Sequence, residues 1–251
     1  MKLEEITSWL DATLNVKAFS DVSNNGLQIG RPAGDVDCVA FGVDASARFI
    51  EEAAKAGAKL AVVHHGISWG GGIKTVTGGI YNAIAAAIRA DVALYAVHLP
   101  LDANREVGHN WTIARALGLK DIESAFVYHG ETIGCTGVLP EETAVSDFLE
   151  TVRKLVSGKA SGWNLNCAGK IRKVGICSGG AGDFAEESKN LGCDVFLTGE
   201  ANWGDIIGAG NACAPMICAG HYETEIFGIE KLASKMSENL GVKTVVPFIQ
   251  Y

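Results

Sequence analysis

The sequence predicts an α/β fold in which a strand–helix–strand pattern occurs twice. Short apolar runs typical of buried strands alternate with helical segments up to residue 118, which favours parallel strands joined by right-handed crossovers. A segment of the first half also recurs in the second half. In addition, histidines and acidic residues follow several predicted strands, where open α/β sheets place their ligands.

The first half alternates regularly between the two kinds of element. Leu3, Ile6, Leu10 and Leu14 share one face of a first helix. Ser46 is suited to begin a second helix, and Gly57 is suited to end it. Residues 21–30 are turn-rich and are predicted to form a loop. Helices are therefore expected at 3–14, 46–56, 83–90 and 110–117, and strands at 36–43, 59–63 and 92–97.

The second half is predicted to begin with a strand at 132–139 and a helix at 141–156, after which the chain resembles its own first half. Val39, Phe41, Phe49, Gly57 and Val62 align without a gap, 135 positions away, with Val174, Ile176, Phe184, Gly192 and Leu197. A second alignment, 123 positions apart, matches His98 with His221 and Asp102 with Glu225. These matches indicate an internal duplication. Two similar halves that face each other would bring distant residues to one cleft.

Composition restricts the class of protein. The 251 residues are 48% hydrophobic and 20% charged, as in ordinary globular domains. A formal net charge of −8 argues against general nucleic-acid binding, because such proteins usually carry a basic face. The sequence contains neither a run of roughly 20 apolar residues, as a membrane span requires, nor a signal-peptide core near Met1. We therefore expect a cytoplasmic protein with no membrane association.

Seven cysteines are scattered through the chain without any C-x-x-C pair. This distribution is typical of reduced, buried thiols in an intracellular protein. Cys213 and Cys218 lie near His221, which leaves a small thiolate–histidine zinc site as an alternative.

Three short segments carry residue types that bind metals. His64 and His65 follow the apolar run at 59–63, and both can reach one site only where the strand ends and the backbone turns. His98 and Asp102 follow the next strand, and His221 and Glu225 are spaced one helical turn apart. Simpler alternatives are a hydrogen-bonded histidine pair, a surface carboxylate at Asp102 and an ordinary first-turn acid at Glu225. Together the segments favour a two-metal site.

These segments resemble the NIF3 family of dinuclear-metal proteins, also labelled GTP cyclohydrolase 1 type 2 homologues. The resemblance rests on His64-His-Gly, His98-Leu-x-Leu-Asp102, Gly199-Glu200, Gly220-His-Tyr-x-Thr-Glu225 and the N-terminal Asn25-Gly-Leu-Gln-Ile-Gly30, and it extends along essentially the whole chain. The length is similar to the short bacterial form. The chain departs from the expected pattern after Glu200, where it reads Ala-Asn-Trp-Gly-Asp.

The resemblance implies two similar, intertwined three-layer α/β/α domains with a metal cleft between them. We expect the first domain at 1–126, completed by 226–251, and the second at 127–225. It also implies a ring-shaped homohexamer, a trimer of dimers.

By the same resemblance, two divalent ions would be held by five ligands, with Glu225 bridging both ions. The ligands are His64, His65, Asp102, His221 and Glu225. Such mixed imidazole and carboxylate ligands suit Zn, Mn, Fe or Co. His98 is interpreted as an orienting or proton-transfer residue, with direct ligation as the alternative. Glu200 is interpreted as an acid of the site, with a helix cap or salt bridge as the alternative.

The function that follows is metal-dependent hydrolysis of a nucleotide or related heterocyclic substrate. The sequence contains no P-loop and no G-x-G-x-x-G after a strand, which disfavours ATP-driven and Rossmann redox chemistry. The alternative is a non-catalytic metal carrier or regulatory scaffold. Trp69 and Trp203 could form aromatic walls and Gly70–Gly72 a mobile lid, although Trp69 could equally be a packing residue.

Overall fold

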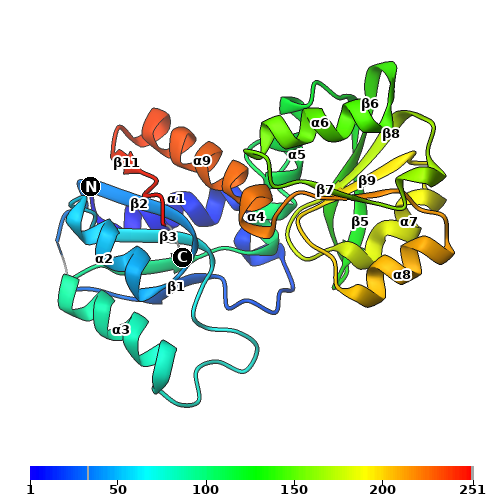
Figure 1. Cartoon of the computed structure of the whole chain (residues 1–251). Coiled ribbons are helices and arrows are strands. Elements are labelled where there is room, and N and C mark those ends of the chain that lie inside the picture. Colours follow the sequence, from blue (N-terminus) through cyan, green and yellow to red (C-terminus); the bar gives the residue numbers. More distant parts are fainter. Residues whose placement is uncertain (33, 250–251) are drawn as a thin grey trace. The chain divides into compact units, whose positions relative to one another are not determined.

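The computed structural model describes residues 1–32 and 34–249, and the chain divides into two compact units (Figure 1). Unit 1 comprises Met1–Leu101 and the chain from Ile229 onward, whereas unit 2 comprises Asp102–Gly228. Each unit contains a mixed sheet with helices on both faces. The predicted α/β fold is therefore confirmed.

The sheet of unit 1 has a parallel centre. Its strands lie in the order β1-β4-β3-β2-β11, and they span Gly26–Ile29 (β1), Cys38–Asp44 (β2), Leu60–His65 (β3), Ala93–Ala96 (β4) and Lys243–Val245 (β11). β1 is antiparallel to β4, and the other pairs are parallel. Because β1 lies within the predicted loop at 21–30, that prediction was wrong: the segment pairs with the edge of β4 despite its turn-forming residues.

Helices cover both faces of this sheet, and Figure 1 shows α2 (Ala47–Lys55) and α3 (Gly78–Ala90) on one face. Alternate strand residues such as Ala40 and Ala61 pack against these helices. α1 (Leu3–Leu14) covers the other face, where Tyr95 donates a 2.6 Å hydrogen bond to Asp11. The short helices η1 (Val16–Ala18) and α4 (Leu99–Asp102) and the long helix α9 (His221–Leu240) complete the elements that contribute to unit 1.

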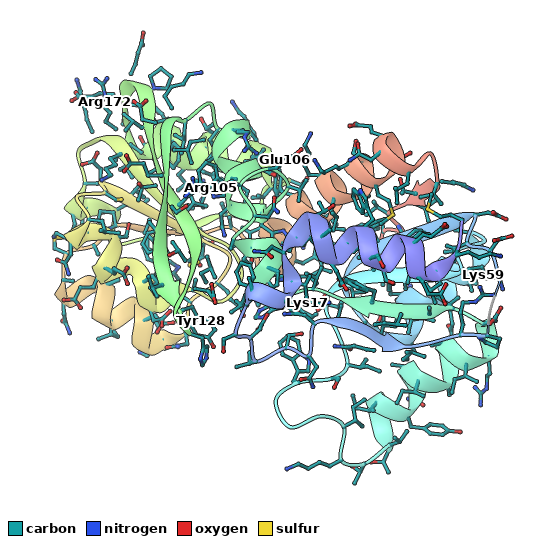
Figure 2. All side chains as sticks on the ribbon, turned by 180° about the vertical axis from the view of Figure 1, so that it is seen from behind. Lys17, Lys59, Arg105, Glu106, Tyr128 and Arg172 are labelled. Carbon is teal, nitrogen blue, oxygen red and sulfur yellow. A yellow bond between two sulfur atoms is a disulfide. The ribbon has the colours of Figure 1, made fainter. Side chains whose placement is uncertain are left out.

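The two ends of the unit 1 sheet differ in character. At the amino-terminal end of β3, Lys59 (labelled in Figure 2) and Arg31 both donate to the carboxylate of Asp91. At the carboxyl end lie the histidines. The ion pairs therefore stabilise the amino-terminal end of the sheet, whereas the histidines at the carboxyl end are available for ligands.

The sheet of unit 2 has the order β5-β6-β8-β9-β10-β7. Its strands span Lys120–Tyr128 (β5), Glu131–Ala144 (β6), Ser161–Trp163 (β7), Lys170–Cys177 (β8), Val195–Thr198 (β9) and Met216–Cys218 (β10). The central strands β8, β9 and β10 are parallel, and the outer ones are antiparallel to their neighbours. β5 was not predicted.

Helices lie on both faces of this second sheet (Figure 1). α5 (His109–Ala116) and α6 (Val145–Leu155) bury Trp111, Phe148 and neighbouring residues against it. α7 (Ala185–Asn190) and α8 (Trp203–Asn211) lie on the opposite face, where both contact the short helix η3 (Gly182–Phe184). The short helix η2 (Leu165–Cys167) follows β7, and its Leu165 packs against the cluster of Trp111 and Phe148. α6 begins four residues later than predicted because β6 continues to Ala144.

The internal duplication is confirmed by the order of the elements. The series β2-α2-β3-α3-β4 of unit 1 corresponds to β8-α7-β9-α8-β10 of unit 2. β3 and β9 begin at Leu60 and Val195, which are 135 residues apart, as the first alignment requires. β4 and β10 begin at Ala93 and Met216, which are 123 residues apart, as the second requires.

The division into compact units falls after Leu101, and the domain boundary expected at residue 126 stays a prediction. Residues 102–126 lie in unit 2 because β5 pairs with β6 from Lys120 to Tyr128. The return of the C-terminal segment to unit 1 begins at Ile229, three residues after the predicted point.

The cysteines differ in part from the prediction. Cys167 and Cys213 form a disulfide in unit 2, so the prediction of reduced thiols was wrong for this pair. The disulfide links the segment after β7 to the chain just after α8. No local pattern in the sequence indicates this pairing. Cys38, Cys135, Cys177, Cys193 and Cys218 are free thiols. Across residues 1–32 and 34–249, no helix combines the length and apolarity that crossing a membrane requires.

Candidate metal centre

Three imidazoles gather at the carboxyl edge of the unit 1 sheet. β3 ends with His64 and His65, and His98 follows β4, which runs parallel to β3. The ring centroid of His64 lies 4.6 Å from that of His65 and 5.0 Å from that of His98. One ligand-type nitrogen from each ring lies within 4.8 Å of the others. The parallel register thus joins the predicted residues of unit 1 into one cluster.

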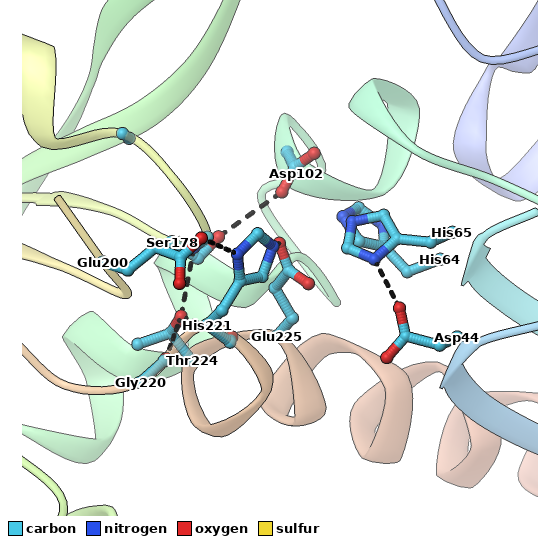
Figure 3. Close-up of polar contacts among 12 residues, drawn as sticks. Asp44, His64, His65, Asp102, Ser178, Glu200, Gly220, His221, Thr224 and Glu225 are labelled. Atoms are coloured by element: carbon cyan, nitrogen blue, oxygen red, sulfur yellow. Dashed lines mark hydrogen bonds and ion pairs between the residues drawn. The ribbon is translucent and has the colours of Figure 1, made fainter. Parts of the chain in front are cut away.

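Each of these rings is held through its Nδ1 atom. Nδ1 of His64 donates to the carbonyl oxygen of Val97 (3.0 Å), and Nδ1 of His65 donates to Oδ1 of Asp44 (2.9 Å) (Figure 3). The Nδ1 atom of His98 bonds Oδ1 of Asp21, also at 2.9 Å. An oxygen that holds the Nδ1 proton fixes the tautomer in which Nε2 carries the lone pair. The Nε2 atoms of the cluster are therefore the nitrogens available to bind a metal ion.

Asp21 is the most strongly bound carboxylate of unit 1. Burial opposes its ionisation, but hydrogen bonds from His98, the backbone of Ser23 and the Asn25 amide lower its pKa to about 2. The backbone of Leu99 also donates to it. The side chain is 2% exposed. Asp21 therefore remains an anion beside His98 under all ordinary conditions.

The N-terminal segment around residues 25–30 supports the same edge. Oδ1 of Asn25 accepts from the backbone of His98 at 2.8 Å. Oε1 of Gln28 accepts from the backbone of Ile67 (2.7 Å) and Ser68 (3.1 Å), which form the loop after β3. This segment therefore fixes the two loops that carry the histidines.

Unit 2 contributes three carboxylates and one further histidine. Asp102 ends α4 with only 6% of its surface exposed, and Oγ of Ser178 donates to it at 3.4 Å. Asp102 is therefore not the exposed surface carboxylate that we had considered as the alternative. His221 begins α9, and its Nε2 lies 3.1 Å from Oε1 of Glu225, one turn further along. The Nδ1 atom of His221 bonds Oε1 of Glu200 at 2.9 Å (Figure 3).

The position of His221 strongly favours its charged form in the absence of metal. The hydrogen bond to Glu225 raises the pKa of His221 to about 9, against the opposing effect of burial, and Glu200 raises it further. A positive charge is thus stabilised where Nε2 meets the buried carboxylate. A divalent cation would satisfy the same groups after displacing the proton.

A glycine loop after β8 leaves room for this pair. Gly179 adopts a φ of +68°, and a Cβ atom there would lie 2.4 Å from Oε1 of Glu225 and 3.3 Å from Nε2 of His221. The backbone N–H of Gly179 donates to Oγ1 of Thr224. The loop therefore forms a cradle around the His221–Glu225 pair. This cradle and the imidazole–carboxylate donor set fit a divalent transition ion.

Within each unit the structure brings together several of the predicted residues. His64, His65 and His98 meet in unit 1, and His221, Glu225 and Glu200 meet in unit 2. Sequence reasoning missed Asp21, Asp44 and Gly179. Asp44 could have been found, because it ends a strand parallel to β3 and therefore shares its edge. Asp21 could not, because it lies 77 residues from His98 in a segment without a repeating pattern.

Two other groups near these residues are less suited to bind metal. His109 is fully buried, and its Nδ1 accepts a hydrogen bond from the backbone of Gly228, so its Nε2 carries the proton. The thiolate–histidine zinc alternative fails because Cys213 is in the disulfide, and burial raises the pKa of Cys218 to about 11.

Comparison with known proteins gives a family match along nearly the whole chain. The family model described as Duf34/NIF3 (NGG1p interacting factor 3) matches residues 1–250. A protein of Deinococcus radiodurans named "GTP cyclohydrolase 1 type 2 homolog" is 39% identical over 95% of this chain and 90% of its own length.

Solved structures show the same fold. One, titled "protein ybgI, unknown function", is 29% identical, covers 100% of this chain and 99% of its own, and has a TM-score of 0.92. TTHA1606 from Thermus thermophilus is 28% identical, with the same coverage and a TM-score of 0.88. From the family match, the identity to relatives and the shared fold, this chain belongs to the Duf34/NIF3 family.

Proposed function

We propose that this protein binds two divalent transition ions and uses them to hydrolyse a nucleotide or related heterocyclic molecule. The anchoring of the histidines through Nδ1 carries this proposal, because it prepares Nε2 of His64, His65 and His221 as ligands. The two units would supply the ligands jointly, and the full set is His64, His65, Asp102, His221 and Glu225. Glu225 would be the ligand that both ions share.

The chemistry divides between ligands and supporting residues. When bound, such ions lower the pKa of a coordinated water and polarise a carbonyl, imine or phosphoryl oxygen of the substrate. His98 would transfer the proton, because Asp21 holds its Nδ1 at 2.9 Å and its ring lies beside the rings of His64 and His65. Glu200 would position His221 through the bond to Nδ1.

The first test is elemental analysis of protein purified without chelator or affinity nickel. We expect two transition ions per chain in the wild type. Glu225→Gln should lose most of both, because the substituted amide cannot bridge two cations. Glu230→Gln is the matched control: the residue is exposed on the same helix, and we expect full metal content.

Two further variants test whether one centre uses both units. His65→Ala changes unit 1 and His221→Ala changes unit 2. If the ions share one dinuclear centre, each variant should weaken both ions, whereas separate sites would lose one ion each. Metal content of zero in the wild type after incubation with Mn, Fe, Co or Zn would refute the proposal.

Catalysis is tested separately from metal binding. The name of the Deinococcus relative makes GTP the first substrate to try, followed by other nucleotides. His98→Ala should keep both ions and lose turnover by about 10²–10⁴-fold, the usual contribution of a positioned proton-transfer group. Loss of one ion in that variant would instead identify His98 as a ligand.

A metal carrier is the second candidate function. It is favoured by the exposure of His221 and Glu200, whose side chains are 37% and 62% exposed, because an open ligand set permits ion exchange. A carrier should pass its ions rapidly to a chelator and show no turnover on the nucleotide panel. Turnover that depends on the metal and disappears in His98→Ala would contradict this alternative.

A further inference from the structure

A cavity of about 680 Å³ in unit 1 lies beside the imidazole cluster and is separate from the proposed metal ligands. Its walls come from four short segments: the turn after β2, the start of α2, the loop after β3 and the start of α3. The volume is in the range typical of small-molecule sites. The cavity therefore has room for a ligand as well as a connection to the histidines.

The walls favour an anion. Among the described residues that line the cavity, Arg48 carries a charge and there is no carboxylate, although the chain as a whole has a net charge of −8. Ser46, Thr77 and Asn82 add polar groups. A basic lining in an acidic protein indicates selection for a negatively charged occupant.

Two helices also begin at this cavity, which reinforces the positive potential. α2 starts at Ala47 and α3 at Gly78, and both starts belong to the lining segments. Ser46 caps α2 by accepting from the backbone of Phe49, whereas Thr77 makes no side-chain cap bond at the start of α3. The first N–H groups of α3 are therefore suited to bind oxygens of an anion, in addition to the guanidinium of Arg48.

Trp69 connects the cavity to the imidazole cluster. It lines the cavity, and its ring centroid lies 6.0 Å from that of His65 and 5.2 Å from that of His98. Its Nε1 donates to the carbonyl oxygen of Gly66 at 2.9 Å, and Gln28 holds the same loop by two backbone hydrogen bonds. The indole is thus fixed in place, and 37% of Trp69 is exposed. A flat ring system would find a preformed aromatic wall there.

We propose that this cavity binds the phosphate group of a nucleoside monophosphate or similar phosphorylated heterocycle. The phosphate oxygens bind Arg48 and the start of α3, and the ring packs against Trp69. The rest of the ligand then extends toward His65, and in this respect the inference rests on the proposed function. Binding of the phosphate in the cavity requires no metal. Arg48 and Trp69 then determine specificity for phosphorylated, ring-containing molecules.

The test is calorimetric titration of the full-length, chelator-treated protein with GMP, guanosine and inorganic phosphate. We expect GMP to bind more tightly than guanosine or inorganic phosphate, because GMP alone carries both a phosphate for Arg48 and a ring for Trp69. Arg48→Gln should weaken GMP at least tenfold and leave guanosine unchanged. Trp69→Leu should weaken GMP and guanosine but not inorganic phosphate.

Arg89→Gln is the matched control, because Arg89 is exposed on α3 outside this cavity. It should bind GMP like the wild type. Equal binding of GMP by wild type and Arg48→Gln, or no binding of GMP at all, would overturn the proposal. Metal content of the wild type is measured in parallel: two ions without GMP binding would refute this inference alone, whereas GMP binding without metal affinity would refute the proposed function alone.

Discussion

His64 and His65 end β3, His98 follows β4 and His221 begins α9, yet each ring is anchored through its Nδ1 atom. The acceptors are a carbonyl oxygen for His64 and carboxylates for the other three. The histidines themselves were predictable from sequence because they follow apolar strands. Among the anchoring acids, Glu200 was predicted and Asp44 could have been found, but Asp21 could not, because a residue that orients a ligand needs only proximity in space.

Asp44 tests how much this orientation contributes to metal affinity. Asp44→Asn should lower the affinity about 10- to 100-fold, because the amide no longer holds the Nδ1 proton of His65 as a charged acceptor. Competition with a coloured chelator measures the change. Asp35→Asn removes an acid that pairs with Lys2 at the surface, and its affinity should equal that of the wild type. Unchanged affinity in Asp44→Asn would show that backbone geometry alone positions His65.

Asp21 predicts a specific pH dependence of stability. Its pKa is lowered from 3.8 to about 2 in the folded protein, so the stabilisation by its charge is complete above about pH 4 and is lost as the pH falls toward 2. Asp21→Asn should therefore be less stable than the wild type at pH 6, by roughly 1–3 kcal/mol. Urea unfolding at several pH values measures the difference, which should shrink between pH 4 and pH 2. A difference that stays constant over this range would contradict the assignment.

At the scale of elements, the turn between β8 and α7 is as important for the site as any strand. Gly179→Ala should lower metal content, because the new methyl group would occupy the space of the Glu225 carboxylate and the φ of +68° disfavours alanine by roughly 1–2 kcal/mol. Gly208→Ala is the control, since its Cβ meets open space on α8 and alanine favours the helix. Elemental analysis and thermal unfolding of both variants distinguish loss of the cradle from general destabilisation. Full metal content in folded Gly179→Ala would show that the cradle is not needed.

Elements with a strong hydrophobic period were predicted well, and those determined by tertiary pairing were not. α1 and α5 match the predicted helices within a residue at each end. β1 and β5 were missed because edge strands are half exposed and have no continuous apolar run. α3 begins five residues before the predicted 83 because its first turn contains glycines, which carry no apolar signal.

At the scale of the whole molecule, the duplication explains how one chain could obtain an asymmetric donor set. His98 and His221 occupy equivalent positions after β4 and β10, and in both cases a carboxylate holds Nδ1. At the position equivalent to His65, however, unit 2 has Glu200, whose Oε1 holds the Nδ1 atom of His221. The repeat was predictable because its spacing is constant. The different roles of equivalent positions in the two units were not predictable, because they depend on which side chain occupies each strand end.

The assembly state is the last prediction, and it belongs to the whole chain. The family resemblance implies a hexameric ring, and several large apolar side chains are exposed on both units, including Ile88 (68%), Val127 (56%) and Trp203 (68%). Exposed apolar surface of this kind commonly marks an interface. Light scattering coupled to size exclusion should therefore give about six times the 26.3 kDa chain mass, with dimers appearing on dilution because the ring is expected to be a trimer of dimers. A monomer at all concentrations would contradict the hexamer, and those side chains would then need another partner.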